Sequence, residues 1–530
     1  MKTNGHYPSI FNDVIGPVMR GPSSSHCAAS LRIGRMARDL MAGELKDVLI
    51  RFDAHGSLAT THHSQGSDMG LFGGLLGWEA HDERLKDYET AIADAGINVK
   101  IEINDYNDTH PSTYRLILEN NKESHEMTAI STGGGMIQVK KIDNAVVSMA
   151  GDFYETLIYT DKKNEKQMLA YLKNNITADH IIPGKGDRTK PAFIQIKAQK
   201  FLDPEALNQL RSRFNVTAVK ELKPVLPILS HNPMNVPFIT CREMLTYNED
   251  KHLDLWQLAV HYEGARGNIS ADEVFEKMGH IVRIMKESIL EGTAGTEYKD
   301  RILGYQSGFF KSQMENNRLL DAGILNQMIL YTTAMMEIKS SLGLIAACPT
   351  AGACAALPGA CIGAAETMGL AEEEITKAML AAGMIGIFIS AHSTFSAEIG
   401  GCQAECGAAS GMAAAALVTL AKGSTAQALG AASMALQNIF GMVCDPVAGR
   451  VEVPCLGKNV MAASNVLSCA NMAAANFDAV LPLDEVIDAM DKVGKSIPSE
   501  LRCTALGGLS VTKTSKSIEE KLSNLSCDKK

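Results

Sequence analysis

Three cysteines in the C-terminal half of the chain could bind a metal centre. Cys402, Cys444 and Cys455 each stand at a turn-like position with Gly or Pro close by. Their spacing does not match a zinc ribbon, because the chain has no Cys-x-x-Cys pair. Thiolates brought together from separate turns suit a soft metal or an iron–sulfur cluster, and three ligands would leave one iron open to a substrate. The alternative is that each cysteine is a small buried hydrophobic residue.

A serine-rich loop near the N-terminus could bind a carboxylate. Residues 21–26 read Gly-Pro-Ser-Ser-Ser-His and precede a segment whose apolar residues follow helical spacing. Proline and serine commonly begin helices, so we predict a loop that leads into a helix N-terminus. Free N–H groups and hydroxyls at such a terminus suit a carboxylate. The alternative is an ordinary capping cluster without a ligand.

The motifs around the three cysteines resemble those of the bacterial iron–sulfur L-serine dehydratases. Residues 401–405 read Gly-Cys-Gln-Ala-Glu, residues 444–449 read Cys-Asp-Pro-Val-Ala-Gly and residues 454–455 read Pro-Cys. They follow one another in the order of that family's α-domain. The resemblance implies that the three cysteines hold a [4Fe–4S] cluster. Glu398 and Glu405 flank the first of them and could orient or tune the cluster, or could be charges on a helix surface.

The N-terminal serine loop resembles the Gly-Pro-Ser-Ser-Ser-His motif of the family's β-domain. The resemblance implies that Ser24, Ser25 and His26 bind the substrate. Cys27 follows them where the family usually has Thr, a small change that should keep the shape of the loop.

A second substrate-binding turn is implied in the C-terminal half. The Pro-Thr-Ala-Gly sequence at residues 349–352 is similar to a turn of the family's α-domain. Its exposed N–H groups and hydroxyl would help to hold an amino acid, so Thr350 and Gly352 are predicted to bind the substrate. A helix break at proline is the alternative.

The candidate general base departs from the family pattern. In the family's Gly-His-x-Thr-Asp motif, the His falls here on Gln65 and the Asp on Asp68, which is predicted to bind the substrate. An amide cannot accept a proton at working pH. The catalytic candidates are therefore Gln65 itself and its neighbours His62 and His63, with His55 as a further alternative. Histidine-rich loops are also often merely solvated.

The C-terminal part carries two further features. Residues 501–509 match the family's Leu-Arg-x-Thr-x-Leu-Gly-Gly-Leu run, which the resemblance places beside the active site. Some relatives place a tail cysteine on the open iron, so Cys527 is a candidate for that role, with a flexible tail as the alternative. The cysteines expected to be buried fillers are Cys348, Cys354, Cys361, Cys406 and Cys469.

The reaction that the resemblance implies is the conversion of L-serine to pyruvate and ammonia. The open iron would act as a Lewis acid for the leaving hydroxyl group, while a base takes the α-proton. No lysine motif for a pyridoxal phosphate cofactor is evident, so we expect that the enzyme does not use pyridoxal phosphate. The alternatives are a cysteine desulfidase, a dehydratase of another β-hydroxy amino acid, and a non-catalytic amino-acid or redox sensor.

The pattern of elements predicts an α+β N-terminal part followed by a large all-α C-terminal domain. Residues 1–152 read as a β-like α/β domain. Residues 153–228 show strand and helix patterns in the order βαββαβ, which indicates an ACT-like insert. Residues 235–515 are almost entirely helix-patterned and correspond to the α-like catalytic domain, and residues 516–530 form a tail.

Composition and charge argue against a nucleic acid or a membrane as a partner of this chain. The net charge is −10 and the sequence shows no basic stripe, so we expect that the protein does not bind nucleic acid. The apolar runs are rich in Gly and Ala and lack flanking basic residues, so we expect that they do not span a membrane. Residues 1–15 have no apolar run and the cysteines form no disulfide framework, which together favour a cytoplasmic location. The expected small-molecule partner is an amino-acid substrate. The sequence leaves open whether the chain is a monomer or pairs with a second copy as a homodimer.

Overall fold

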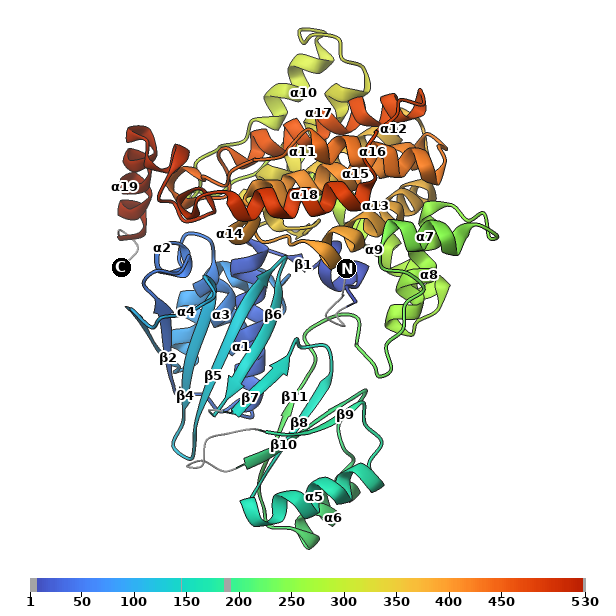
Figure 1. Ribbon diagram of the computed structural model, residues 1–530. Helices are drawn as coiled ribbons and strands as arrows, with labels where there is room; N and C mark the ends of the chain where they lie inside the picture. The colour runs from blue at the N-terminus through green and yellow to red at the C-terminus, as the bar shows by residue number, and fades with distance from the viewer. Residues whose placement is uncertain (1–6, 144, 185–191, 528–530) are drawn as a thin grey trace.

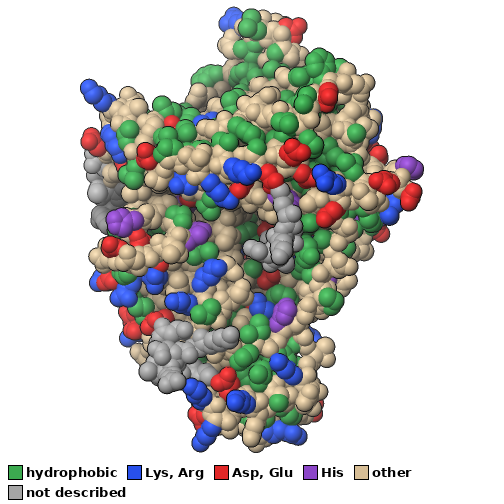
Figure 2. Space-filling model, viewed as in Figure 1, with side chains coloured by type: hydrophobic (Ala, Val, Ile, Leu, Met, Phe, Trp, Pro, Cys, Tyr) green, Lys and Arg blue, Asp and Glu red, His purple; other side chains and the backbone are tan. Residues whose placement is uncertain are grey.

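The protein has a sheet-containing N-terminal part and a mostly helical C-terminal part, which confirms the predicted fold class (Figure 1). The computed structural model describes residues 7–143, 145–184 and 192–527, with side chains described up to Ser523. In Figure 1 the helical domain lies at the top, the larger sheet lies below it, and the insert lies at the bottom. Figure 2 shows hydrophobic side chains over the helical domain, and acidic and basic side chains interspersed.

The N-terminal domain is a six-stranded sheet covered by helices, with strand order β3-β2-β4-β5-β6-β7. Strands β2 and β3 are parallel and the other neighbours are antiparallel. Alternating burial along β5 gives the sheet one face for the core and one for solvent. The strands are β2 (Asp47–Asp53), β3 (Asn98–Asn104), β4 (Thr113–Glu119), β5 (Ser124–Gly133), β6 (Met136–Ile142) and β7 (Ala145–Met149).

Two helices of this domain pack closely because glycines stand at their contact. A Cβ atom at Gly74 would lie 2.1 Å from the Leu31 carbonyl oxygen, and one at Gly34 would lie 2.5 Å from the Leu71 carbonyl oxygen. The helices are α1 (Ala29–Leu40) and α3 (Ser67–Leu75), and α4 (Tyr88–Asp94) follows them. Because the serine loop precedes α1 and Gln65 precedes α3, this contact brings the two segments side by side.

The insert has the order of elements that its sequence pattern indicates. Its four strands form an antiparallel sheet in the order β11-β8-β10-β9. The elements are β8 (Tyr154–Thr160), α5 (Lys162–Asn175), β9 (His180–Pro183), β10 (Ala192–Ala198), α6 (Pro204–Arg213) and β11 (Val216–Leu222). Leu157 and Phe193 belong to the same hydrophobic core as α1 and the larger sheet, so the insert packs directly on the N-terminal domain.

The C-terminal domain is built around apolar helices that neighbours cover on all sides. Helix α13 is long and apolar enough to cross a membrane by length and composition, but 78% of its most apolar window is buried inside the protein. A core helix passes the same test. The helices of this domain are α7 (Cys241–Asn248), α8 (Leu255–Gly267), α9 (Ala271–Ala294), α10 (Ser307–Glu315), α11 (Ile324–Ser340), α12 (Ala356–Thr367), α13 (Glu372–His392), α14 (Ala397–Gly400), α15 (Cys406–Leu420), α16 (Thr425–Gln437), α17 (Cys455–Ala474), α18 (Leu483–Ser496) and α19 (Lys513–Cys527).

The first described residues join the two parts of the molecule. Ser9 Oγ and the Ile10 N–H donate to the buried Glu263 carboxylate of α8, at 2.5 and 2.7 Å. Ile10 packs against Gly383 of α13, where a Cβ atom would lie 2.8 Å from the Ile10 side chain. Strand β1 (Val18–Met19) then pairs with β12 (Ile345–Ala346) of the helical domain. The serine loop is therefore anchored beside the turn at residues 349–352.

Candidate active site

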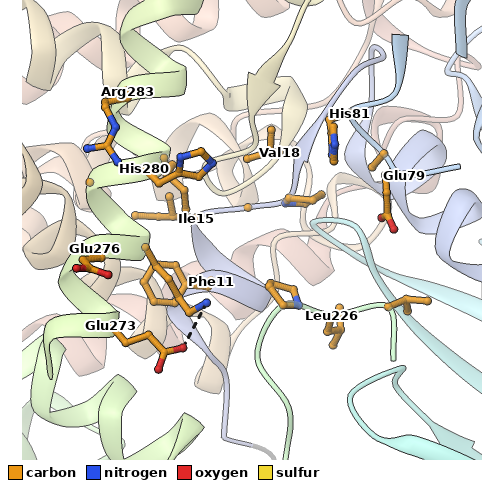
Figure 3. Close-up of a pocket in the computed structure, with 18 of the residues that line it drawn as sticks. Phe11, Ile15, Val18, Glu79, His81, Leu226, Glu273, Glu276, His280 and Arg283 are labelled. Carbon is orange, nitrogen blue, oxygen red and sulfur yellow. Dashed lines mark ion pairs between the residues drawn. The ribbon is translucent and has the colours of Figure 1, made fainter. Parts of the chain in front are cut away.

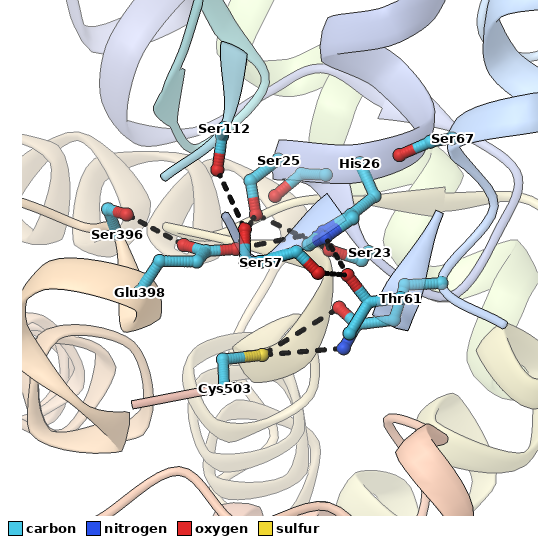
Figure 4. Close-up of polar contacts among 12 residues, drawn as sticks. Ser23, Ser25, His26, Ser57, Thr61, Ser67, Ser112, Ser396, Glu398 and Cys503 are labelled. Carbon is cyan, nitrogen blue, oxygen red and sulfur yellow. Dashed lines mark hydrogen bonds and ion pairs between the residues drawn. The ribbon is translucent and has the colours of Figure 1, made fainter. Parts of the chain in front are cut away.

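The serine loop and its histidine are buried between the two domains. His26 is 1% exposed, and its Nδ1 and Nε2 atoms lie 3.0 Å from Ser23 Oγ and from Thr61 Oγ1, respectively (Figure 4). Ser24 Oγ accepts the Ala351 N–H at 3.2 Å. The loop thus contacts the Pro-Thr-Ala-Gly turn directly, and the structure brings these two predicted substrate-binding segments together.

A carboxylate from the helical domain completes this cluster. Glu398 on α14 accepts hydrogen bonds from Ser25 Oγ at 3.1 Å and Ser396 Oγ at 2.6 Å, and it lies 3.6 Å from His26 Nδ1. Figure 4 shows Glu398 facing Ser25 and His26, with Cys503 below them. Burial lowers the pKa of His26, while the Glu398 charge opposes this shift. A carboxylate and an imidazole in this arrangement can hold and pass a proton.

Gln65 is buried and its amide contacts a thiol from the far end of the chain. Its Nε2 donates to Cys503 Sγ at 3.4 Å, and the thiol returns a contact to Gln65 Oε1 at 3.7 Å. Gln65 is 1% exposed and lines a small cavity with Cys444, Cys455 and Glu398. The amide therefore occupies the position at which the family pattern has a histidine, and it faces the cysteines.

The three histidines of the N-terminal loop have different surroundings. His62 Nδ1 lies 2.8 Å from Asp68 Oδ1, and its side chain is 21% exposed. His63 is 51% exposed with Glu89 as its nearest acidic group, and His55 is 79% exposed beside Asp105. Of the three predicted catalytic residues, Gln65 lines the small cavity, whereas His62 and His63 are not among its lining residues.

The predicted ligand cysteines come from three separate segments: Cys402 begins a short helical turn, Cys444 lies in a loop and Cys455 is the first residue of α17. Cys402 and Cys444 pack in one cluster with Cys406 and Cys503. Cys444 and Cys455 line the same small cavity, which also contacts Glu405. Within the described residues, no group of three His, Cys, Asp or Glu side chains is arranged around a single metal ion. A cluster requires a wider spacing than one ion does, because each cysteine binds a different iron.

The charges around these thiols suit an anionic metal centre. A hydrogen bond from the Cys406 thiol, together with the nearby Lys458 charge, lowers the pKa of Cys402 to about 7 despite its burial. The neighbouring Cys503 thiol and burial raise the pKa of Cys444. Burial raises the pKa of Cys455, and the charge of Lys339 opposes this shift; Lys339, on α11, is fully buried and donates to the Val451 carbonyl oxygen. A buried lysine near several thiols is a feature that the sequence alone did not reveal.

A second set of polar contacts holds the cysteine loops in place. Lys458 Nζ donates to Asp445 Oδ1 at 3.0 Å, and Asp445 Oδ2 accepts the Leu509 N–H at 3.0 Å. Gly508 has a φ of +57°, and a Cβ atom there would lie 2.6 Å from Asp445 Oδ2. The Gly-Gly run thus allows residues 501–509 to pack against the Cys444 loop, in keeping with the position that the family resemblance implies.

Asn459, which sequence reasoning missed, links the start of α17 to the substrate turn. Its Nδ2 donates to the Gly352 and Cys455 carbonyl oxygens at 2.8 and 2.9 Å, and its Oδ1 accepts the Ala356 N–H at 3.0 Å. It stands one helical turn after Cys455, which is the signal that could have identified it.

The substrate turn also contacts a buried carboxyl group. Thr350 Oγ1 donates to Glu405 Oε1 at 2.7 Å, and a Cβ atom at Gly352 would lie 3.0 Å from the same oxygen. Burial and the nearby Cys402 charge raise the pKa of Glu405 to about 8. Glu398 and Glu405 therefore lie inside the site rather than on a helix surface. The described side chains end before Cys527, so its predicted role lies outside them.

Comparisons with known proteins match both parts of the chain. A family model described as "Serine dehydratase beta chain" matches residues 14–142, and one described as "Serine dehydratase alpha chain" matches residues 250–510. The chain is 33% identical to a "Probable L-serine dehydratase, alpha chain" of Bacillus subtilis over 285 residues, which cover 54% of this chain and 95% of that protein.

Two other relatives extend this likeness. The "Probable L-serine dehydratase, beta chain" of Bacillus subtilis is 32% identical over 219 residues, covering 41% of this chain and 98% of the relative. The "L-serine dehydratase 1" of Escherichia coli is 26% identical over 501 residues, covering 93% of this chain and 96% of the relative. The regions that are two chains in Bacillus subtilis are fused in one chain here.

Proposed function

Because this chain belongs to the serine dehydratase family, with its beta-chain and alpha-chain regions fused, we propose that it converts L-serine to pyruvate and ammonia. The observation that carries the proposal is one buried cavity lined from both domains. Ser25 and Gln65 come from the N-terminal domain, while Glu398, Cys444 and Cys455 come from the helical domain. Substrate-binding hydroxyls, a carboxylate and thiols thus meet at one place.

We propose a [4Fe–4S] cluster held by Cys402, Cys444 and Cys455 as the cofactor. The fit is supported by the buried cluster of thiols and by the charges of Lys339 and Lys458 beside them. When bound, the cluster supplies a Lewis-acidic iron for the leaving hydroxyl group. The same thiols and the eleven free cysteines of the described side chains support a reducing, cytoplasmic environment.

The chain's own residues would bind and orient the amino acid. Ser24 and Ser25 lie in the helical turn at residues 24–28 that leads into α1, with Thr350 on the facing turn, so their hydroxyls can hold the substrate carboxylate between the domains. Burial of this region excludes water from the substrate, which strengthens each of these hydrogen bonds. Binding in this orientation places the α-carbon of serine in the cavity that Gln65 and Glu398 line.

Glu398 is our candidate for the proton acceptor. It is the carboxylate that lines the cavity and also lies beside an imidazole, that of His26. The α-proton would pass to a Glu398 oxygen as the Cβ–O bond breaks, and Glu398 would return this proton to the departing hydroxide, so that water leaves and 2-aminoacrylate remains. The aminoacrylate then tautomerises to an imine, and water hydrolyses it to pyruvate and ammonia. Gln65, an amide, would orient the substrate and would not take the proton.

The test is product release by anaerobically purified, iron-reconstituted protein. We expect pyruvate and ammonia in equal amounts from L-serine, together with about four irons and four sulfides per chain. Cys455→Ser should lose the iron and the activity together, whereas Cys361→Ser, in a fully buried position on α12, should keep both. Sulfide release from L-cysteine without turnover of L-serine would identify a desulfidase instead. Iron-free protein that still turns over L-serine would contradict the cluster.

A further inference from the structure

A large cavity lies between the domains, separate from the candidate active site. Its volume is about 1130 Å³, slightly more than the roughly 300–1,000 Å³ of ordinary small-molecule pockets. Figure 3 shows Phe11, Ile15 and Val18 on its inner wall, Glu79 and His81 on one side, and His280 and Arg283 of α9 on the other. Leu226, from the segment that follows the insert, closes the remaining side.

One buried guanidinium lines this cavity with few partners of its own. Arg32 of α1 is 4% exposed, and its Nη1 donates to the Gly135 carbonyl oxygen at 2.6 Å and contacts Met136 Sδ at 3.8 Å. No carboxylate of the described residues lies within ion-pair distance of it. Burial lowers the pKa of Arg32 to about 10, with Asp13 opposing this shift, so the group is still charged at neutral pH. A buried cation without a carboxylate partner is costly.

The other arginine and lysine side chains that line the cavity are already paired with carboxylates. Arg35 pairs with Glu79 at 2.5 Å, and Lys277 pairs with Glu273 at 3.5 Å. Arg283 pairs with Glu372 at 3.4 Å. Arg32 is therefore the one arginine or lysine, among the described lining residues, that lacks an acidic partner. The glutamates around it disfavour a ligand with two negative charges.

We propose that this cavity binds a small aliphatic monocarboxylate, whose carboxylate pairs with Arg32 and whose carbon chain packs on Ile15, Val18 and Leu226. Arginine offers parallel N–H donors that match a carboxylate, and the inner wall is apolar. The ligand would contact α1, α9 and the segment after the insert at once. It would therefore fix the position of the insert's linker against the helical domain, apart from the chemistry of the active site.

The test is equilibrium binding of propionate to the purified full-length protein, followed by tryptophan fluorescence. Trp78 precedes Glu79 of the cavity wall, and the ring of Trp256 lies 6.1 Å from that of Phe275, a lining residue. We expect saturable binding that Arg32→Gln weakens by about ten- to a hundredfold, the effect of losing a charged hydrogen-bond partner. Arg38→Gln, further along α1 and not among the lining residues of the cavity, should bind as the wild type does.

Two further variants keep the proposal testable if Arg32→Gln does not fold. Gly279→Leu would fill the cavity from α9, where a Cβ atom meets its nearest neighbour at an ordinary 3.6 Å, and should abolish binding while Arg32 stays in place. Ser24→Ala, at the candidate active site, should leave the fluorescence change intact. Three outcomes would each overturn the proposal. The first is loss of the fluorescence change in Ser24→Ala but not in Arg32→Gln. The others are tighter binding of inorganic phosphate than of propionate, and no saturable binding of propionate.

Discussion

At the residue scale, we assign hydrogen bonding to the substrate and proton transfer to two different residues of the site, Gln65 and Glu398. Gln65 stands at the position at which the family pattern has a histidine, and its amide contacts Cys503 rather than a charged partner. Glu398 has the opposite character, because it is ionisable, lines the same cavity and lies beside His26. The proposed roles follow from the chemistry of the two groups: the Gln65 amide orients the substrate, and the Glu398 carboxylate accepts the proton.

Replacing Glu398 tests this division. Glu398→Gln keeps the shape and an oxygen acceptor for the serine hydroxyls but removes the basic group. We expect kcat for L-serine to fall by about 10²- to 10⁴-fold with a small change in KM, because general base catalysis contributes that much. Steady-state pyruvate formation by iron-reconstituted protein measures both constants. Glu44→Gln, at an exposed position, is the matched control. Unchanged kcat together with a raised KM would assign Glu398 to substrate binding instead.

At the element scale, the close contact of α1 and α3 positions the N-terminal half of the site. The two helices meet at Gly34 and Gly74, where neither helix has room for a side chain. Their N-terminal ends carry the serine loop and Gln65. A small separation of the helices would therefore move substrate-binding groups relative to Glu398 in the other domain.

A methyl group at this contact tests that role. In Gly74→Ala the added Cβ would lie 2.1 Å from the Leu31 carbonyl oxygen, which is part of the backbone and cannot rotate away. We expect a loss of about 1–3 kcal/mol in the free energy of unfolding and a lower kcat/KM. Gly430→Ala on α16 has its nearest contact at 4.0 Å. It should be neutral or stabilising by up to about 1 kcal/mol. Denaturant unfolding measures both; equal stability of the two variants would contradict the packing argument.

The insert contains a buried carboxyl group that should make its stability depend on pH. Burial raises the pKa of Glu155 on β8 to about 7, although Lys197 lies 3.3 Å away and Gln195 donates at 2.9 Å. Between pH 4.5 and 7 the folded state then binds more protons at this group than the unfolded state does. The contribution of Glu155 to the free energy of unfolding is therefore greatest at low pH and falls as pH rises, by about 3 kcal/mol in total.

Hydrogen exchange at β8 would detect this dependence. In the wild type, the protection of β8 amides should decrease between pH 5 and pH 8 after correction for intrinsic exchange rates. Glu155→Gln cannot titrate, so its corrected protection should change less over the same range. The comparison between the two proteins removes the effect of all other titrating groups. Parallel pH profiles for wild type and variant would show that Glu155 ionises normally.

At the scale of the whole molecule, the N-terminal segment ties the sheet domain to the helical domain. Ser9 and Ile10 donate to Glu263, the Tyr262 hydroxyl donates to the Pro8 carbonyl oxygen, and β1 pairs with β12. These contacts are buried and specific, which is the character of a permanent interface. The relatives named as separate alpha and beta chains match the two sides of this interface.

Splitting the chain tests whether these contacts are sufficient for assembly. Residues 1–230 and 231–530, co-expressed as two chains, should associate and recover cluster-dependent turnover of L-serine. Glu263→Ala in the second chain should weaken association by more than tenfold, because Ser9 and Ile10 would lose their buried acceptor. Glu287→Ala, exposed on α9, is the control. Size-exclusion chromatography reports the complex, and two halves that never associate would show that covalent linkage is required.

The sequence by itself determined the local features of this protein. Helical spacing of apolar residues predicted a helical C-terminal domain, and the strand and helix patterns within residues 153–228 predicted the order of the insert's elements. Glycine and proline beside the cysteines predicted their loops. These features depend on residues that are near one another in the chain, so periodicity and turn chemistry are enough to indicate them.

Only the tertiary structure decided which of these groups meet. Gln65 and Cys503 are 438 positions apart and Ser25 and Glu398 are 373 positions apart, yet each pair is in hydrogen-bond contact. Such contacts depend on how α1 packs on α3 and on how the N-terminal segment enters the helical domain. Local patterns carry no information about them, because the free energy that selects them comes from burial of surfaces distant in sequence. For the same reason the buried charges of Lys339 and Arg32 became apparent only in the folded chain.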